Sequence, residues 1–316
     1  MGIFSTIEQF GRKFTQPVNL ALGMFDGVHL GHQQVLAASR DHAREINGKS
    51  VAFTFPFHPA SFLRPESAPL LLMNAQQKAR MLHSYGVDHV ILRDFDHEFA
   101  EIAASDFGVF IKEKIPSVQG LSVGENFRFG KKREGDSSFL QQVGEKMGMY
   151  VQVAESKNLD ADAVSSSRIR EALMTGEIGS VNRMLGRNYR IYGTVFPGKK
   201  MGRSIGFPTM NLNWQPEAHP AYGVYAGHVK NLITGSILPA VANYGMRPTV
   251  EKTAPLPKFE IHALADLDER EWGYESEVEM DLKSFIRPEK KFDSLDELKD
   301  QIKIDRTKAA ELLKSF

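Results

Sequence analysis

The sequence predicts an α/β domain followed by a β domain, each with its own hydrophobic core. With 316 residues, the chain is about twice the length of a typical single domain. In its first part, short apolar runs alternate with amphipathic stretches, which is typical of βαβ units and a parallel sheet. Beyond Gly186, the chain becomes rich in Gly, Pro, Tyr and Val with frequent turn signals, which indicates an antiparallel barrel or sandwich. We therefore expect two domains, 1–186 and 187–316.

The predicted strands and helices of the first domain follow the apolar runs. Strands are expected at 18–22, 51–55, 87–92, 120–123 and 150–153. Helical spacing marks 33–45 and 75–85, with Asn47, Gly48 and Gly86 as C-terminal stops. The alternation of these segments supports a parallel sheet covered by helices.

A final helix is predicted after the β segments. Ser294 and Glu297 have the spacing of a capping box, in which each side chain satisfies a backbone N–H at the start of a helix. Leu298, Ile302 and Leu312 follow at roughly helical spacing. The second domain is therefore expected to end in a helix.

Composition narrows the class of protein. Hydrophobic residues make up 42% and charged residues 25% of the chain, as in an ordinary globular protein. Lys plus Arg equals Asp plus Glu at 39 each, so no overall positive field attracts nucleic acid, and we expect no nucleic-acid partner. No apolar run approaches the roughly 20 residues that span a bilayer, and residues 1–15 lack the layout of a signal peptide. The absence of Cys is compatible with a reducing compartment. We expect a cytoplasmic protein without membrane contacts; its oligomeric state is open, with a monomer assumed.

The most informative stretch runs from Leu20 to His32. It passes from a buried strand through a turn into the start of a helix, where free backbone N–H groups and the helix dipole attract phosphate. The carboxyl edge of a parallel sheet is also where ligands of α/β proteins usually bind. Gly23, Gly27 and Gly31 let the backbone approach a ligand closely. These features predict a phosphate site.

His29 and His32 are the predicted catalytic pair at this site. Two imidazoles three residues apart can hydrogen-bond an α-phosphate and the leaving pyrophosphate as charge develops, without a covalent intermediate. One alternative is a structural His beside a solvated one. Another is a zinc site, which would lack Cys ligands and the acidic residue of an HExxH arrangement.

A cluster of Ser at 165–167 opens a second candidate segment, a helix that Gly176 closes. A single Ser suffices for an N-cap. Here three Ser residues precede Arg168 and Arg170, whose guanidinium forks suit phosphate oxygens. A His-x-Gly-His site followed much later by a Ser/Arg loop is similar to the layout of the adenylyltransferases related to class I tRNA synthetases.

Two further stretches contain glycine and basic residues. The loop 123–135 follows a strand; most such charge runs are solvated turns, but Asn126 and the loop cations are better explained by ATP. The segment 193–200 nearly matches a Walker A motif. Lys200 stands where Ser or Thr would meet Mg²⁺, and the intervening residues favour a strand, so this segment is excluded as a P-loop.

Together these pieces resemble the bacterial bifunctional riboflavin kinase/FAD synthetase family over nearly the whole chain. The N-terminal matches are GMFDGVHLGH (23–32), TFPFHP (54–59), VGENFRFGKKREG (123–135) and SSSRIR (165–170). The resemblance implies a Rossmann-like nucleotidyltransferase domain in which His29 and His32 assist attack of the FMN phosphate on the α-phosphorus of ATP. It implies nucleotide contacts at Gly23, Phe25, Asp26, Gly31, Asn126, Ser166, Ser167 and Arg170, and flavin contacts at His58 and Pro59.

The C-terminal half resembles the riboflavin kinase module of the same family. Its matches are GRSIGFPTMNL (202–212), YGVYAG (222–227), NYGMRPT (243–249) and FEIHAL (259–264). The resemblance implies an antiparallel β-barrel in which Thr209 and Asn211 bind Mg²⁺ and Glu260 is the base for the ribityl 5′-hydroxyl. It also implies a flap at 198–206 and a flavin contact at Arg287. Nucleotide contacts are implied at Gly202, Gly206 and Pro208.

The chemistry of the residues agrees with these assignments. A hydroxyl and an amide oxygen are hard ligands suited to Mg²⁺. A carboxylate is a reasonable base for an alcohol when it lies close. Taken alone, Thr209 and Asn211 would equally suit a Pro-Thr turn with an Asx hydrogen bond. Met210 and Tyr244 depart from the family pattern, which usually has Ala and Ile there.

The predicted reactions are sequential. Riboflavin and ATP give FMN in the C-terminal domain, and FMN and ATP give FAD and pyrophosphate in the N-terminal domain, both with Mg²⁺. One alternative is an adenylyltransferase with another acceptor, such as pantetheine phosphate, nicotinamide mononucleotide or a cytidylyl acceptor. The other is a flavin- or nucleotide-binding regulator without turnover.

Overall fold

The computed structural model describes residues 2–198, 202, 205–246, 257–268 and 270–314. The chain divides into two compact units, Met1–Ser166 and Ser167–Phe316. This division precedes the predicted boundary at 186/187 because α9 (Ile178–Leu185) packs on strands of the second unit. The helix before it, α8 (Ser166–Thr175), begins at the division.

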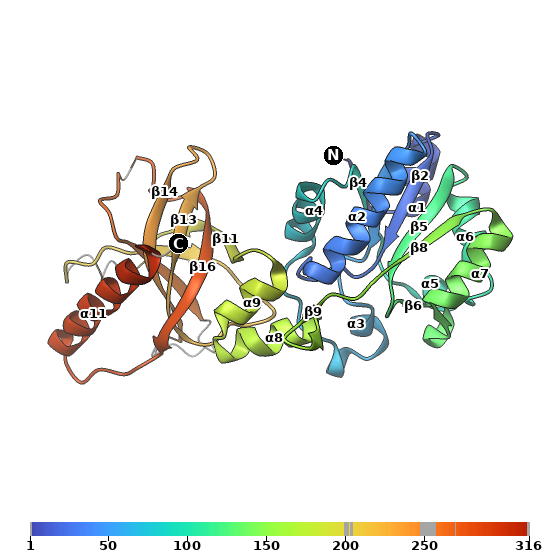
Figure 1. Ribbon diagram of the computed structural model, residues 1–316. Coiled ribbons are helices and arrows are strands. Elements are labelled where there is room, and N and C mark those ends of the chain that lie inside the picture. Colours follow the sequence, from blue (N-terminus) through green and yellow to red (C-terminus); the bar gives the residue numbers. More distant parts are fainter. Residues whose placement is uncertain (1, 199–201, 203–204, 247–256, 269, 315–316) are drawn as a thin grey trace. The chain divides into compact units, whose positions relative to one another are not determined.

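The first unit is built on a six-stranded sheet in the order β1-β4-β3-β2-β5-β8, in which all neighbours are parallel (Figure 1). The strands are β1 (Gly2–Phe4), β2 (Val18–Leu22), β3 (Lys49–Thr54), β4 (His89–Leu92), β5 (Val118–Gly124) and β8 (Tyr150–Ala154). The predicted parallel sheet is confirmed. The chain proceeds outward on one side of β2 through β3 and β4, and on the other through β5 and β8. Ligands of α/β proteins bind at such a switch point.

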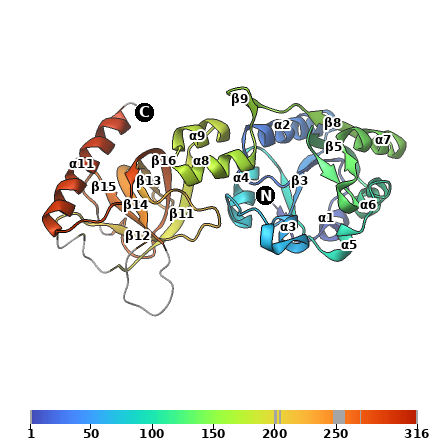
Figure 2. The ribbon, with the colours of Figure 1, turned by 90° about the horizontal axis from the view of Figure 1, so that it is seen from below.

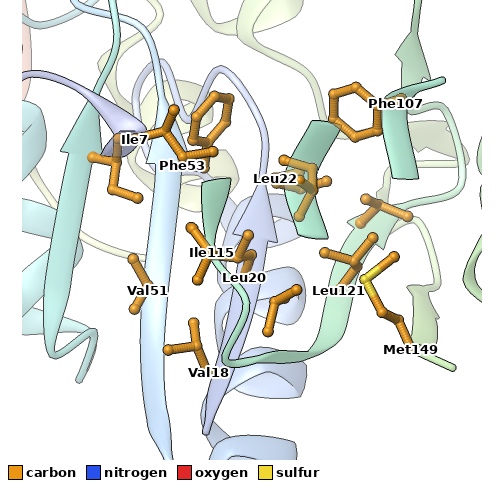
Figure 3. Close-up of a cluster of buried hydrophobic side chains, with 14 of the residues drawn as sticks. Ile7, Val18, Leu20, Leu22, Val51, Phe53, Phe107, Ile115, Leu121 and Met149 are labelled. Atoms are coloured by element: carbon orange, nitrogen blue, oxygen red, sulfur yellow. The ribbon is translucent and has the colours of Figure 1, made fainter. Parts of the chain in front are cut away.

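Helices cover both faces of this sheet. One face carries α1 (Ile7–Lys13), α6 (Phe107–Lys114) and α7 (Ser137–Met147), whose apolar side chains join those of Leu20, Val51 and Leu121 in one core (Figure 3). The other face carries α2 (Leu30–Glu45) and α4 (Ala75–Ser84) against Ala21 and Ala52. Successive residues of a strand point to opposite faces, so β2 is buried along its whole length. Shorter elements are α3 (Pro59–Leu63), α5 (His97–Ala100) and the hairpin strands β6 (Arg128–Phe129), β7 (Gly135–Asp136), β9 (Asn158–Leu159) and β10 (Asp162–Ala163).

The second unit contains a closed antiparallel barrel in the order β11-β12-β15-β14-β13-β16. Its strands are β11 (Tyr189–Phe196), β12 (Met210–Asn213), β13 (Gly223–Asn231), β14 (Ile237–Gly245), β15 (Lys258–Ala263) and β16 (Glu277–Pro288). The terminal helix α11 (Leu295–Lys314) packs on β13, β14 and β16 (Figure 2). The Ser294 hydroxyl accepts a hydrogen bond from the Glu297 N–H at 3.2 Å, so the predicted cap is present.

Some elements differ from the prediction at their ends. The helix expected at 33–45 begins three residues earlier, at Leu30, because His29 caps it. The sequence did not predict β1, whose three residues are too few to display alternation, or α1 after it. Within the described ranges, no helix is long and apolar enough to cross a membrane.

Candidate active sites

The turn from β2 to α2 has a strained backbone. Phe25, Gly27 and Val28 have φ angles of 50°, 81° and 41°. Glycine adopts such angles freely, but a β-branched residue does so at a cost of about 1–3 kcal/mol. The side chains of Phe25 and Val28 are fully buried, and burial of each contributes about 1.5–3 kcal/mol, which offsets the strain. Packing of the chain itself therefore holds this turn in shape.

His29 is the N-cap of α2. Its Nδ1 accepts a hydrogen bond from the backbone N–H of His32 at 3.4 Å. A neutral imidazole whose Nδ1 accepts carries its proton on Nε2, which leaves Nε2–H as a donor. Burial lowers the pKa of His29 to about 4. At neutral pH, His29 therefore presents an uncharged N–H donor.

His32 stacks on His29, with ring centroids 3.7 Å apart and an interplanar angle of 19°. The edge of Phe25 packs against His32 at 5.4 Å between centroids. Burial, followed by electrostatic interactions with His29 and Lys78, lowers the pKa of His32 well below its usual value. Its Nδ1 is buried and has no hydrogen-bond partner among the described residues. Buried polar atoms are rarely left unpaired, so this nitrogen is suited to a ligand.

Three other predicted nucleotide contacts lie at the same turn or against it. The Asp26 carboxylate is buried and accepts a hydrogen bond from the Leu72 N–H at 2.9 Å. The Asp26 carbonyl accepts one from the Ser166 hydroxyl at 2.9 Å. Gly31 leaves room for the imidazole of His29, because a Cβ there would lie 3.2 Å from His29 Cε1. Asp26, Ser166 and Gly31 thus shape the turn.

The predicted ATP loop, 123–135, makes several contacts with other residues of the first unit. Asn126 follows β5, is exposed, and donates to the Ser156 hydroxyl at 3.5 Å. Lys131 forms an ion pair with Glu101 at 2.5 Å, and Phe129 is buried in the core. The loop cation Lys131 therefore has a protein partner. Asn126 lies at the carboxyl edge of the sheet.

Four other predicted residues lie in α3 and α8 or at the start of α3. His58 is the N-cap of α3, where its Nδ1 accepts from the Ala60 N–H at 3.1 Å, and Pro59 is the first residue of that helix. Ser167 and Arg170 lie in α8 within the second unit, and Arg170 donates to the Ser167 hydroxyl at 3.4 Å. Their ligand contacts stay predictions.

Sequence reasoning missed Lys78. This residue of α4 is fully buried, and its Nζ donates to the Phe55 carbonyl at 2.7 Å. Its charge is one of the influences that lower the pKa of His32. The available signal was a lysine in the apolar stripe that contains Ala79 and Leu82, where a buried charge needs a reason.

The predicted kinase residues meet on two neighbouring strands of the barrel. Thr209 directly precedes β12, Asn211 lies in β12, and the register of β12 and β15 places Asn211 opposite Glu260. Residues directly opposite each other point to the same face of a sheet. A hydroxyl, an amide and a carboxylate, distant in sequence, thus gather on one face.

Glycines approach this group closely. A Cβ on Gly198 would lie 2.2 Å from Asn211 Nδ2, and one on Gly202 would lie 3.3 Å from Thr209 Oγ1. Gly206, two residues before Pro208, has a φ of 89°, which favours glycine. Positions 199–201 and 203–204 of the predicted flap lie outside the described residues.

Arg287, the predicted flavin contact, is paired with the terminal helix. Its Nε lies 3.0 Å from Asp305 Oδ1, and its Nη2 lies 2.7 Å from Asp305 Oδ2. Asp305 is buried, so this two-point ion pair binds α11 to the barrel. The pair gives Arg287 a structural partner, and its contact with flavin stays a prediction.

Comparison with known proteins agrees with this architecture. The chain is 41% identical over 289 residues to the bifunctional riboflavin kinase/FMN adenylyltransferase of Haemophilus influenzae, covering 90% of this chain and 91% of the relative. It is 36% identical to the enzyme of the same name from Escherichia coli strain K12, covering 92% and 91%. The chain belongs to the bifunctional riboflavin kinase/FMN adenylyltransferase family.

The family assignment holds for both halves of the chain. A family model described as FAD synthetase matches residues 12–168, and one described as riboflavin kinase matches residues 185–313. A crystal structure titled as a macrolide-efflux protein from Streptococcus pneumoniae is also similar, with a TM-score of 0.84 and 27% identity over 96% of this chain and 97% of that chain. The architecture described above is therefore shared over nearly the whole length of that solved chain.

The buried state of His29 predicts an unusual titration. We expect a pKa of about 4 in the folded chain without ligands, against 6.5 for an exposed His. Between these values the unfolded chain binds a proton that the folded chain does not, so His29 lowers stability as pH falls through this window and has no such effect above it. An NMR titration of the imidazole ring measures the pKa.

His29→Asn supplies the assignment for that titration. An Asn oxygen still accepts the N-cap hydrogen bond, so the helix start is retained while one imidazole signal disappears. A signal lost in this variant that titrates near pH 6.5 in the parent protein would contradict the dominant effect of burial.

Proposed function

We propose that the chain converts riboflavin to FMN and then FMN to FAD, consuming ATP in each step. In this proposal, residues 1–186 form the adenylyltransferase domain and residues 187–316 form the riboflavin kinase domain. The observation that supports it best is the stacked, uncharged pair of His29 and His32 at the start of α2, beside the switch point of the sheet.

Adenylyl transfer at this turn requires stabilisation of charge that moves toward the leaving group. An oxygen of the FMN phosphate attacks the α-phosphorus of ATP, and the bond from that phosphorus to the β-phosphate oxygen breaks, releasing pyrophosphate. The His29 Nε2–H donates to a phosphate oxygen, and His32 supplies a second imidazole beside it. Both rings are neutral before ATP binds, so the site avoids two stacked cations and can raise its positive charge when the triphosphate arrives.

The other N-terminal contacts that we propose come from the resemblance and the turn geometry. Gly23, Phe25, Asp26 and Gly31 form the turn around the triphosphate. Asn126, Ser166, Ser167 and Arg170 are proposed nucleotide ligands, and His58 and Pro59 are proposed flavin contacts.

Phosphoryl transfer is proposed on the face shared by β12 and β15. Glu260 takes the proton of the ribityl 5′-hydroxyl, whose oxygen attacks the γ-phosphorus of ATP while ADP leaves. The hydroxyl of Thr209 and the side-chain oxygen of Asn211 are hard donors that would hold Mg²⁺. When bound, Mg²⁺ supplies neutralisation of the ATP phosphates. Gly202, Gly206 and Pro208 are proposed to contact the nucleotide, and Arg287 the flavin.

The proposal includes the setting of the enzyme. We propose that it acts in the cytoplasm on small molecules, as a monomer, without a nucleic-acid or membrane partner. The equal numbers of acidic and basic residues support the absence of a polyanionic partner.

A product assay tests the whole function. The purified chain is incubated with riboflavin, ATP and Mg²⁺, and the flavins are separated by chromatography over time. We expect FMN first and FAD later. FAD formed only from supplied FMN would mean an inactive kinase domain, and no flavin product would favour a different acceptor or a binding role.

We predict that His32→Ala lowers FMN adenylylation by about 100-fold or more, because loss of one charge-stabilising donor has effects of this size. Riboflavin phosphorylation should stay near the parent rate, since the proposed kinase residues lie in the other unit. FAD formation from supplied FMN and FMN formation from riboflavin are measured in parallel. Loss of both activities in a folded variant would contradict separate sites.

We predict the reverse for Glu260→Gln, which keeps the shape of the side chain and removes its basicity. Riboflavin phosphorylation should fall by about 100-fold or more, as expected for loss of a general base. FAD formation from supplied FMN is the matched control and should not change. A kinase rate within a few-fold of the parent would remove Glu260 from the role of base.

A further inference from the structure

His262 is the fourth member of the group formed by the proposed kinase residues. The register pairs Asn211 with Glu260, and its continuation by one residue brings Thr209 opposite His262. Residues two apart in a strand share a face, as do residues directly opposite. Thr209, Asn211, Glu260 and His262 therefore form a two-by-two group on one face of the barrel.

The imidazole of His262 makes one well-defined hydrogen bond. It is 8% exposed, and its Nδ1 lies 2.7 Å from the Pro208 carbonyl oxygen. A carbonyl can only accept, so Nδ1 carries the proton and donates. Burial lowers the pKa of His262, which keeps the ring neutral and leaves Nε2 without a proton. This Nε2 is buried without a hydrogen-bond partner within the described part of the chain.

The bond from His262 acts on the peptide that leads into β12. The Pro208 carbonyl and the Thr209 N–H belong to the same planar peptide unit, so fixing the direction of one fixes the other. Before this peptide, the Phe207 N–H donates to the Gly202 carbonyl at 2.7 Å. His262 is thus a buried side chain of β15 that anchors the chain just before β12 begins.

Neighbouring rings hold this anchor in place. Phe207 is buried and packs edge-on against His262, with centroids 5.8 Å apart. The guanidinium of Arg306 in α11 lies 5.7 Å from the centre of the Phe207 ring, on which it forms a cation–π contact. These contacts support the orientation of the His262 ring in which Nδ1–H reaches the Pro208 carbonyl.

We infer that His262 is a positioning residue for the kinase reaction, whose Nδ1–H holds the Pro208–Thr209 peptide so that Thr209 and Asn211 face Mg²⁺ and phosphate beside Glu260. It acts through the chain and does not itself bind the metal. This inference rests on the proposed kinase function.

Three substitutions of His262 distinguish the roles of its two ring nitrogens. His262→Ala removes both, and we expect kcat for riboflavin phosphorylation to fall by about 100-fold, the size of effect expected from misplaced reacting groups. The KM for riboflavin should stay within about threefold, while the Mg²⁺ concentration for half-maximal rate rises. The side-chain amide of Asn reaches the place of Nδ1, whereas that of Gln reaches the place of Nε2. We expect His262→Asn to restore most of the rate and His262→Gln to restore little.

Controls separate positioning from folding. His228→Asn changes another strand histidine of the same barrel and should leave kinase kinetics near the parent values. Trp214 and Trp272 lie in the second unit, so their fluorescence reports its unfolding in every variant. If His262→Ala does not fold, the comparison of the Asn and Gln variants at matched folded fraction decides the question.

Three results would overturn the inference. The first is a folded His262→Ala whose kcat stays within about threefold of the parent. The second is rescue by Gln and not by Asn, which would assign the role to Nε2. The third is a kcat loss with unchanged Mg²⁺ dependence that only follows the folded fraction, as a purely structural residue would give. An inactive parent kinase would instead overturn the proposed function, so the two failures are distinguishable.

Discussion

The turn between β2 and α2 is the constraint on which the rest of the first unit depends. Val28 keeps its φ angle of 41° because its side chain and that of Phe25 are fully buried. That backbone path delivers His29 to the N-cap position, where the imidazole replaces the usual Ser or Asp. The hydrogen bond that caps the helix also fixes the tautomer of the ring. One contact therefore both stabilises the start of α2 and leaves Nε2–H as a donor.

In both units, a histidine forms a hydrogen bond between its Nδ1 and the backbone. His29 and His58 accept a backbone N–H at Nδ1, and His262 donates from Nδ1 to a backbone carbonyl. In each case the backbone determines the role of the first nitrogen, and the second nitrogen has the opposite character: a donor in His29 and an acceptor in His262. Burial lowers the pKa of His29 to about 4 and also lowers the pKa of His262, which favours the neutral form of both rings.

Much of the fold could be predicted from the sequence because its signals are local and repeated. The run 18–22 is apolar, bounded and fully buried, and it became β2 without change. Ser294 caps α11 as its spacing to Glu297 indicated. The strand β1 had no such signal, since three residues show no period and their pairing with β4 is set by the whole sheet. The closure of the barrel likewise depends on distant pairs that no local pattern reveals.

The sites were less predictable because the charge and type of a residue do not show which other side chain it will contact. His29, His32 and Asp26 were predicted together, and the structure places them in one turn. The charge of Arg287, by contrast, is held by Asp305, a residue in another element that the sequence could not connect to it. Lys78 was missed for the same reason. It lowers the pKa of His32 only because folding brings the two residues close together. Residue type predicts chemistry, but packing decides whether a side chain is available for a ligand.

The most direct measurement is a crystal structure of the chain with a non-hydrolysable ATP analogue. We predict triphosphate oxygens at about 2.7–3.2 Å from His29 Nε2, with His32 beside them at the start of α2. A well-defined triphosphate in the first unit that lies away from this turn would contradict it.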